Sequence, residues 1–189
     1  VMRTVQELET AGVCAASIED TDLPQPFGSV GTPRMLSIEE SVGKMKAAIE
    51  GRQDPKFVIA GRTSACTISN VDDCIARAKA YEAAGVDMIF LAGVKSHDDI
   101  EAVATEVKIP MIIGGGTAAD LDSYAELGVR IALQGHKPIM AAGRAGYDTL
   151  KALRDGTPHG DIEYFADADM MKQVTRGGDY DRWMQEYLN

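Results

Sequence analysis

The sequence contains few cysteines, and it has no apolar run long enough to cross a membrane. Its three cysteines, Cys14, Cys66 and Cys74, are odd in number and lack the spacing of a zinc site. Cys14 lies in an apolar run and Cys74 on the face of a predicted helix. We therefore expect both to be core thiols, as in a reducing cytoplasm, and we expect no signal peptide. These absences argue against a disulfide-stabilised secreted protein, a zinc module and a membrane protein.

Positive charge is scarce as well. The 189 residues include 19 basic and 29 acidic side chains, which gives a net charge of −10. Nucleic acids and anionic membrane surfaces select for basic patches, so neither is expected as a partner. A small anionic substrate remains compatible with this charge, because it responds to the local field of a cleft. The acidity also has a simpler explanation in solubility.

The sequence does contain a repeated strand–loop–helix unit. Each of five short apolar runs is bounded by glycine or a polar residue, which is typical of strands buried on both faces. The runs are Val13–Ile18, Phe57–Ala60, Met88–Ala92, Pro110–Ile113 and Val129–Leu133. Apolar residues at helical spacing follow each run, and this alternation indicates a parallel sheet with right-handed crossovers. No G-x-G-x-x-G follows a strand, which disfavours a dinucleotide-binding open sheet and favours a barrel.

Several helix ends are marked in the sequence. Ser37 and Glu40 have the spacing of a capping box, and Ser96 is a candidate N-cap. The dipeptide Ala84-Gly85 is typical of a helix C-cap. Residues 1–11 also have helical spacing, so a helix is expected before the first strand.

We predict an α/β fold, an N-terminally truncated part of a (β/α)8 TIM barrel with about five βα units and C-terminal helices. A complete barrel needs about 250 residues, and a helix that opens a parallel array should follow a strand. Residues 1–160 are expected to form the partial barrel, from the third helix through the eighth βα unit. Residues 161–189 are expected to form a helical tail. Its apolar side chains would pack on the barrel or on a neighbouring subunit.

Chemistry in parallel barrels is placed at the carboxyl ends of the strands. Glu19 and Asp20 follow the first predicted strand and could bind a hard cation, or could form a helix cap or a surface ion pair. Arg62 follows the second and could hold a carboxylate, or form a structural salt bridge. His136 follows the fifth and could bind substrate, shuttle a proton or be structural. Gly114–Gly116 could cradle a phosphate or simply form a tight turn.

The stretch Asp22–Ser37 is a 16-residue loop between a predicted strand and its helix. It is rich in proline and glycine. A loop of this length on the catalytic face is usually a lid or a binding loop, although a surface insertion would have the same composition.

Three groups of motifs, in this order and at these spacings, resemble the isocitrate lyase/phosphoenolpyruvate mutase superfamily over essentially the whole chain. They are Ser17-Ile18-Glu19-Asp20-Thr21, Gly61-Arg62-Thr63-Ser64-Ala65 and Tyr81-Glu82-Ala83-Ala84-Gly85-Val86-Asp87. Within the superfamily the chain is most similar to the oxaloacetate decarboxylase branch. The stretches that carry this are Val1–Val5 with Glu7-Leu8-Glu9, Ile18–Pro24 with Phe27-Gly28, and Gly128–Arg130 with Gly135-His136.

The resemblance implies a (β/α)8 barrel that holds Mg2+, with Mn2+ as an alternative, and binds a small 2-oxo dicarboxylate. It implies that Arg62 contacts a substrate carboxylate and that Glu19 belongs to the metal environment through water. It implies that His136 is a substrate contact and a catalytic residue. It also implies a homo-oligomer, a dimer of dimers that exchanges a C-terminal helix. The strand that should carry the principal metal-binding aspartate would precede Val1.

The lid that the resemblance implies contains Asp22, Leu23, Pro24, Phe27 and Gly28, with neither the lysine of the superfamily's lyases and mutases nor the cysteine of its lyases. Cleavage of a carbon–carbon bond by a retro-aldol step needs an acid for the departing carbanion, whereas decarboxylation mainly needs an electron sink. The expected activity is therefore Mg2+-dependent conversion of oxaloacetate to pyruvate and CO2. Alternatives are a C–C lyase of the methylisocitrate or 2,3-dimethylmalate type, a carbon–phosphorus enzyme, or an inactive fragment acting in binding or assembly. A phosphate-binding barrel isomerase, suggested by the glycine run alone, is a more distant alternative.

Overall fold

The structure is a computed structural model that describes residues 1–24, 33–94, 96–114, 121–163 and 165–188. The chain divides into two compact units, Val1–Gly135 and His136–Asn189, and each is described by itself. The expected boundary between barrel and tail at residue 160 remains a prediction.

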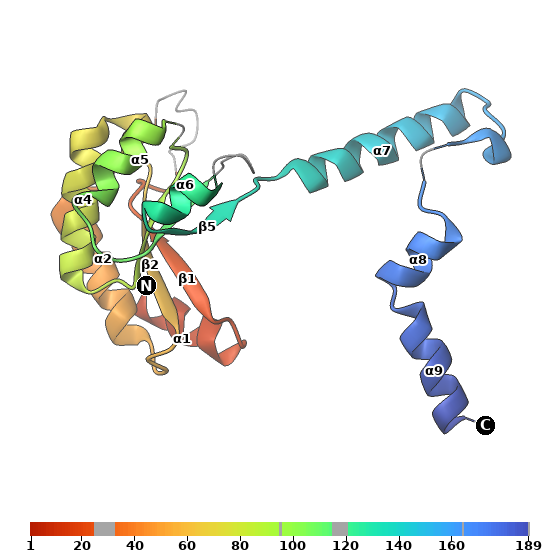
Figure 1. The fold of residues 1–189 in the computed structure, drawn as a ribbon, viewed down its shortest axis with the longest axis horizontal. Helices are drawn as coiled ribbons and strands as arrows, with labels where there is room; N and C mark the ends of the chain where they lie inside the picture. Colours follow the sequence, from red (N-terminus) through yellow and green to blue (C-terminus); the bar gives the residue numbers. More distant parts are fainter. Residues whose placement is uncertain (25–32, 95, 115–120, 164, 189) are drawn as a thin grey trace. The chain divides into compact units, whose positions relative to one another are not determined.

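A parallel five-stranded sheet forms the first unit (Figure 1). Its strands are β1 (Ala15–Glu19), β2 (Val58–Thr63), β3 (Met88–Leu91), β4 (Met111–Gly114) and β5 (Val129–Leu133). They are hydrogen-bonded in the order β1-β2-β3-β4-β5. Each described strand lies beside its neighbour in sequence, as in a (β/α)8 barrel, whereas an open doubly wound sheet reverses its order at a switch point. The five predicted strands and the α/β barrel architecture are confirmed.

Helices connect the strands on one side of this sheet. Those of the first unit are α1 (Met2–Thr10), α2 (Ile38–Gly51), α3 (Ala65–Ile68), α4 (Val71–Ala84), α5 (His97–Ala104) and α6 (Leu121–Glu126). Helices α2, α4 and α5 lie side by side along one face of the sheet (Figure 1). The predicted boundaries are confirmed, because Ser37 accepts from the Glu40 amide at 3.1 Å, Ser96 accepts from the Asp99 amide at 3.3 Å, and Gly85 is left-handed with φ 98°.

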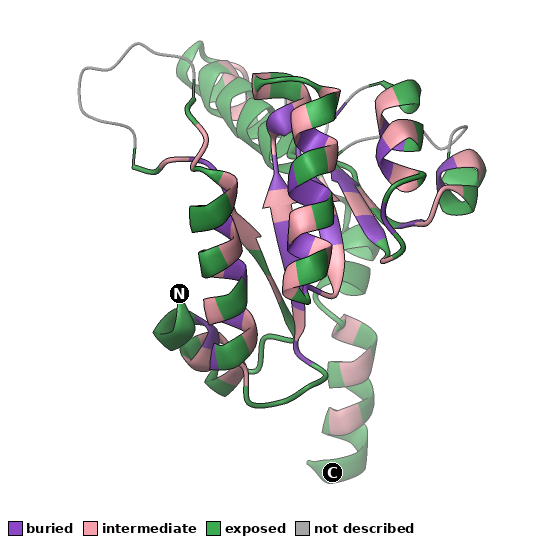
Figure 2. Cartoon of the chain, turned by 90° about the vertical axis from the view of Figure 1, so that its left-hand side faces the viewer, coloured by how far each residue is buried: buried purple, intermediate pink, exposed green. Residues whose placement is uncertain are grey.

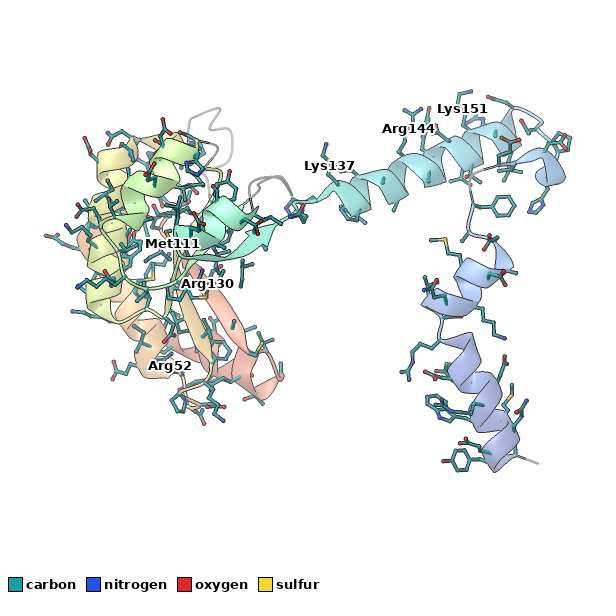
Figure 3. All side chains as sticks on the ribbon, viewed as in Figure 1. Arg52, Met111, Arg130, Lys137, Arg144 and Lys151 are labelled. Atoms are coloured by element: carbon teal, nitrogen blue, oxygen red, sulfur yellow. The ribbon has the colours of Figure 1, made fainter. Side chains whose placement is uncertain are left out.

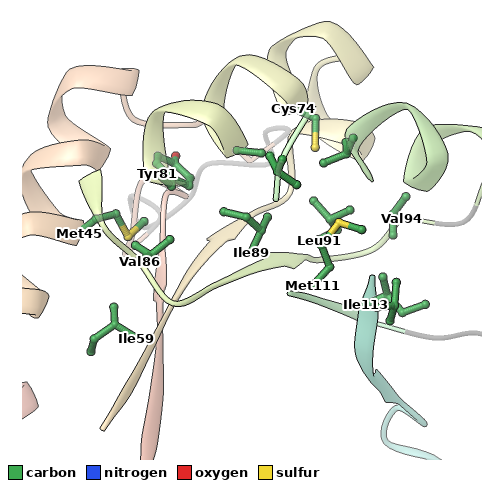
Figure 4. Packing of buried hydrophobic residues seen from close by; sticks show 14 of the residues in the cluster. Met45, Ile59, Cys74, Tyr81, Val86, Ile89, Leu91, Val94, Met111 and Ile113 are labelled. Carbon is green, nitrogen blue, oxygen red and sulfur yellow. The ribbon is translucent and has the colours of Figure 1, made fainter. Parts of the chain in front are cut away.

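The core lies between these helices and the sheet, where buried residues are concentrated (Figure 2). Met45, Ile59, Ile89 and Met111 meet there with Tyr81, which is fully buried (Figure 4). Because successive strand residues face opposite ways, every second residue of the strands faces the helices. Cys74 belongs to this core as predicted, but the prediction for Cys14 was wrong. It is exposed, since it lies before β1 at the amino edge of the sheet, outside the layer that the helices cover.

The second unit consists of helices alone. It contains α7 (Lys137–Arg154), a 3-10 turn (His159–Asp161), α8 (Ala168–Val174) and α9 (Gly177–Tyr187). None of its described residues is buried. The side chains of α7, among them Arg144 and Lys151, spread around the helix in Figure 3. Among the described residues, no helix has the length and apolar character needed to cross a membrane.

Candidate active site at the carboxyl end of the sheet

Three side chains from neighbouring strands line up across the face of the sheet that points away from the helices. Glu19 on β1 is the register partner of Arg62 on β2, and Arg62 is the partner of Phe90 on β3. Residues that are side by side in a parallel sheet point to the same face. The row continues with Ile112 and Ile131. The sequence therefore places a carboxylate, a guanidinium and an aromatic ring next to one another near the carboxyl ends of three strands.

Arg62 is held from both sides within this row. Its Nη1 lies 3.5 Å from Oε2 of Glu19, and its Cζ lies 5.3 Å from the centre of the Phe90 ring. About a third of the side chain, 34%, is exposed. Among the described residues, nothing accepts from its buried Nε. A guanidinium that is oriented by a ring and one carboxylate, with donors left over, is suited to bind an anionic group.

Glu19 has further contacts that fix its orientation. The Thr21 hydroxyl donates to its Oε1 at 2.8 Å, and the Lys44 ammonium of α2 donates to its backbone carbonyl at 2.5 Å. The carboxylate is partly exposed. Mg2+ and Mn2+ take carboxylate oxygens and retain several waters, so Glu19 fits as one contributor to the environment of such a cation. Sequence reasoning missed Phe90, Thr21 and Lys44. Only the strand register could have indicated Phe90.

Asp20 lies next to Glu19 but belongs to a different environment. Its carboxylate is fully buried, accepts from the Tyr81 hydroxyl at 2.6 Å, and lies 3.3 Å from Nη1 of Arg77. Burial and then the hydrogen bond to Asp20 raise the pKa of Tyr81. Desolvation lowers the pKa of Arg77, but its hydrogen bonds with Tyr81 and Asp73 outweigh this and leave it raised. Asp20 is thus part of a buried polar cluster rather than the surface ion pair considered from sequence.

The described part of the predicted lid is a short paired stem. The Leu36 amide donates to the Asp20 carbonyl at 2.9 Å, and the Asp22 amide donates to the Arg34 carbonyl at 2.8 Å. The Asp22 carboxylate also accepts from the Arg34 guanidinium at 2.8 Å. The loop therefore leaves and re-enters the unit at one point, directly after Glu19. Leu23 and Pro24 follow the stem, whereas Phe27 and Gly28 lie outside the described residues.

The remaining residues singled out from the sequence do not belong to the row of Glu19, Arg62 and Phe90. His136 is the N-cap residue of α7 in the second unit and its side chain is exposed, so its role stays a prediction. Gly114 ends β4, and Gly115-Gly116 lie outside the described residues. His97 is exposed as predicted, and its ring stacks on Tyr124.

One group of metal-capable side chains is present within the described ranges. His97, Asp98 and Glu101 have ligand atoms within 4.8 Å of one another at the start of α5. All three are exposed, and His97 is already hydrogen-bonded to Ser123 at 2.7 Å. Exposed groups of this kind are ordinary on an acidic surface, so this cluster adds nothing to the row of Glu19 and Arg62.

Two of the thiols lie on the two helices that follow β2 and contact each other. Cys66 on α3 is partly exposed, and its pKa is lowered mainly by a hydrogen bond with Cys74. Cys74 on α4 is buried, and that hydrogen bond together with desolvation raises its pKa. The two thiols should therefore differ strongly in reactivity.

Comparison with known proteins agrees with this architecture. The chain is 52% identical over 178 residues to an oxaloacetate decarboxylase of Bradyrhizobium diazoefficiens, covering 93% of this chain and 62% of that protein. It is 46% identical over 190 residues to an oxaloacetate decarboxylase of Bradyrhizobium sp. (strain ORS 278), covering 100% of this chain and 66% of that protein. The chain thus spans slightly less than two thirds of the length of these relatives.

Among solved structures, a phosphonopyruvate hydrolase in complex with oxalate and Mg2+ superposes with a TM-score of 0.77. It is 25% identical, and the match covers 100% of this chain and 68% of that one. The family model of phosphoenolpyruvate phosphomutase matches residues 1–154. The family model thus matches most of the chain, and the relatives named above are about half identical to it over nearly its whole length. The chain belongs to the phosphoenolpyruvate phosphomutase family.

Proposed function

We propose that the protein containing this chain is a Mg2+-dependent oxaloacetate decarboxylase that produces pyruvate and CO2. The observation that carries the proposal is the pairing of Glu19 with Arg62 at the carboxyl end of a parallel sheet. This pairing occurs in a chain about half identical to proteins of that name. It combines a carboxylate suited to a hard cation with a cation suited to a carboxylate, which is what a 2-oxo dicarboxylate requires.

The role assigned to Arg62 is to bind and orient one substrate carboxylate. A planar guanidinium can make two parallel hydrogen bonds to a carboxylate, and the Phe90 ring and Glu19 already restrict its rotation. Little conformational entropy is then lost on binding. Fixing one carboxylate in this way also fixes the direction in which the other can leave as CO2.

The metal would be held in part by Glu19 through water, and when bound it would supply Lewis-acid stabilisation of the enolate formed on loss of CO2. Thr21 and Lys44 keep the Glu19 carboxylate and its backbone in one position. His136 would hydrogen-bond the reacting end of the substrate. The lid residues Asp22, Leu23, Pro24, Phe27 and Gly28 would exclude water.

We further propose that the enzyme is a cytoplasmic homo-oligomer, a dimer of dimers. The support lies in the second unit, where large apolar side chains on the helices and on the segments beside them are exposed in this chain. They include Ile139, Met140, Tyr147, Leu150, Phe165, Val174, Tyr187 and Leu188. Such side chains are costly to leave in water, so another surface should cover them.

The test is an assay of the complete protein with oxaloacetate and Mg2+, with metal alone as background. Arg62→Ala should lower kcat/KM by at least about a hundredfold, the loss expected for a two-point carboxylate contact. Arg144→Ala removes an arginine with a surface ion pair to Asp148 and should leave the activity unchanged. No pyruvate above background, or full activity of Arg62→Ala, would refute the proposal.

A carbon–phosphorus enzyme is the second candidate, favoured by the family model and by the similarity to a phosphonopyruvate hydrolase. Turnover of phosphonopyruvate without turnover of oxaloacetate would reverse the ranking. The possibility that the 189 residues act only in binding or assembly is tested by calorimetry with oxalate, an enolate mimic. Mg2+-dependent binding of oxalate by this chain alone would show a working metal and substrate site and would argue against an inert fragment.

A further inference from the structure

A single buried arginine joins both ends of the loop that follows Glu19. Nη1 of Arg77 lies 3.3 Å from the Asp20 carboxylate at the entry to the loop, and the same nitrogen donates to the Leu36 carbonyl at 3.0 Å at its exit. Nε of Arg77 donates to both oxygens of Asp73 at 3.1 Å, which fixes the guanidinium on α4. The side chain of Arg77 is only 8% exposed, and that of Asp20 is not exposed at all.

The paired stem of the loop is too short to be stable through its own backbone hydrogen bonds, so its stability depends on Arg77. Its backbone pairing consists of the Leu36–Asp20 and Asp22–Arg34 hydrogen bonds, which together form a single antiparallel bridge between Thr21 and Met35. A pair of segments this short is not stable by itself in water. The buried cluster behind the stem supplies the missing stabilisation through charged hydrogen bonds in a site without solvent.

We propose that Arg77 is a positioning residue for the candidate active site, acting by clamping the two ends of this stem to α4. The proposal rests on the function proposed above, because Glu19 precedes Asp20 directly and receives the Thr21 hydroxyl from within the stem. Arg62 is paired with Glu19, but it also lies on its own strand and against the Phe90 ring. Loosening the clamp therefore displaces the Glu19 carboxylate and removes this one partner of Arg62, while β2 and Phe90 still hold the carboxylate-binding guanidinium.

The chain offers a matched control at the opposite end of the sheet. Nη1 of Arg52, labelled in Figure 3, likewise joins one carbonyl and one carboxylate, Phe57 at 2.9 Å and Asp87 at 2.6 Å. These partners directly precede β2 and β3, at the amino ends of the strands. Arg52 and Arg77 thus make similar bonds, but only Arg77 makes them beside Glu19.

Arg77→Lys and Arg52→Lys are the informative substitutions. A lysine keeps the charge, but its compact ammonium group cannot replace a guanidinium that binds several acceptors at once. Both variants should lose stability to a similar extent. In Arg77→Lys, hydrogen-exchange protection of the Leu36 and Asp22 amides should fall about tenfold, the equivalent of one hydrogen bond. In Arg52→Lys it should stay within about twofold of wild type.

Kinetics of the complete protein with oxaloacetate and Mg2+ form the second arm. Arg77→Lys should lower kcat about tenfold and leave KM within about twofold, because Arg62 still binds the substrate. Arg52→Lys should change neither. Unchanged exchange in Arg77→Lys, or an equal loss of kcat in both variants, would overturn the proposal. If wild type does not decarboxylate oxaloacetate, the proposed function fails and the exchange arm alone decides the clamp.

If Arg77→Lys does not fold, Tyr81→Phe is a milder substitution in the same cluster. Tyr81→Phe removes one hydrogen bond from the Asp20 carboxylate and leaves Arg77 in place. It should lower the same two quantities by less, the protection at Leu36 and kcat each about threefold. Wild-type exchange and kinetics in this variant would count against the clamp.

Discussion

Removal of the Tyr81 hydroxyl should lower the free energy of unfolding by an amount that depends on pH. The hydroxyl donates at 2.6 Å to a carboxylate oxygen of Asp20, and both residues are fully buried. The other oxygen of Asp20 has no hydrogen-bond partner among the described residues, because Nη1 of Arg77 also lies 3.3 Å from the oxygen that accepts from Tyr81. Tyr81→Phe keeps the ring in the core but leaves this buried charge with one donor fewer.

The expected magnitude follows from the charge on the acceptor. A hydrogen bond to a charged group contributes about 1.5 to 3 kcal/mol, so Tyr81→Phe should lower the free energy of unfolding by about 2 kcal/mol at neutral pH. Burial, followed by the hydrogen bond to Asp20, raises the pKa of the folded Tyr81 above its ordinary value of about 10. The folded state thus retains a proton that the unfolded state loses.

The sign of the pH dependence is set by that difference. The contribution of Tyr81 is fully present below about pH 10. It falls as the pH rises further, by about 1.4 kcal/mol per pH unit, because only the unfolded chain ionises readily. Phenylalanine has no proton to lose. The difference between wild type and Tyr81→Phe should therefore shrink above pH 10 and vanish near about pH 11.5.

Urea unfolding followed by circular dichroism between pH 7 and 11.5 measures this difference directly. Tyr147→Phe, which removes a hydroxyl from an exposed ring, should follow wild type throughout. A difference between wild type and Tyr81→Phe that stays constant from pH 9 to 11.5 would show that the hydroxyl is not the titrating group. A difference below about 0.5 kcal/mol at pH 7 would show that the hydrogen bond to Asp20 contributes little.

Other substitutions and reagents test different parts of the first unit. Gly61→Ala would place a methyl group 3.0 Å from two carbons of Tyr81, so thermal unfolding should show a loss of about 1 to 3 kcal/mol unless α4 moves. Of the three thiols, only Cys74 should escape alkylation by iodoacetamide in the folded state, because it is 1% exposed and its pKa is raised. Peptide mass spectrometry would detect any modification. Asn70→Ala removes the acceptor for the Asp73 amide at the start of α4 and should lower the urea midpoint by the equivalent of about 1 kcal/mol with an unchanged slope.

The strands and helices of the first unit were predictable because their signals are local. A continuous apolar run such as Met88–Leu91 needs no partner to be recognised as a strand, although buried and half-buried residues alternate along it in the structure. The Ser37 cap and Gly85 also depend on their immediate neighbours alone. The exposure of Cys14 was not predictable in this way, since an apolar neighbourhood in sequence does not show which end of a strand the helices cover.

The residues of the site were only partly predictable for a related reason. Arg62 and Glu19 could be named from their place at strand ends, but their pairing depends on the register between β1 and β2. Phe90 looks like an ordinary strand residue, and only the partnership with Arg62 gives it a role. Arg77 is one of several charged residues on α4, and its contact with Leu36 joins positions 41 residues apart. Contacts between distant residues leave no periodic signal in a sequence.

The consecutive carboxylates of Glu19 and Asp20 show how the scaffold and the site are connected. Successive residues of an extended chain point to opposite faces, so Glu19 faces Arg62 on the open side while Asp20 enters the buried cluster with Tyr81 and Arg77. A shift of either residue by one position would bury the site carboxylate and expose the structural one. Because Asp20 is fixed in the buried cluster, the neighbouring Glu19 is fixed in position as well. A half-exposed carboxylate at the end of a strand can therefore be as well oriented as one inside the core.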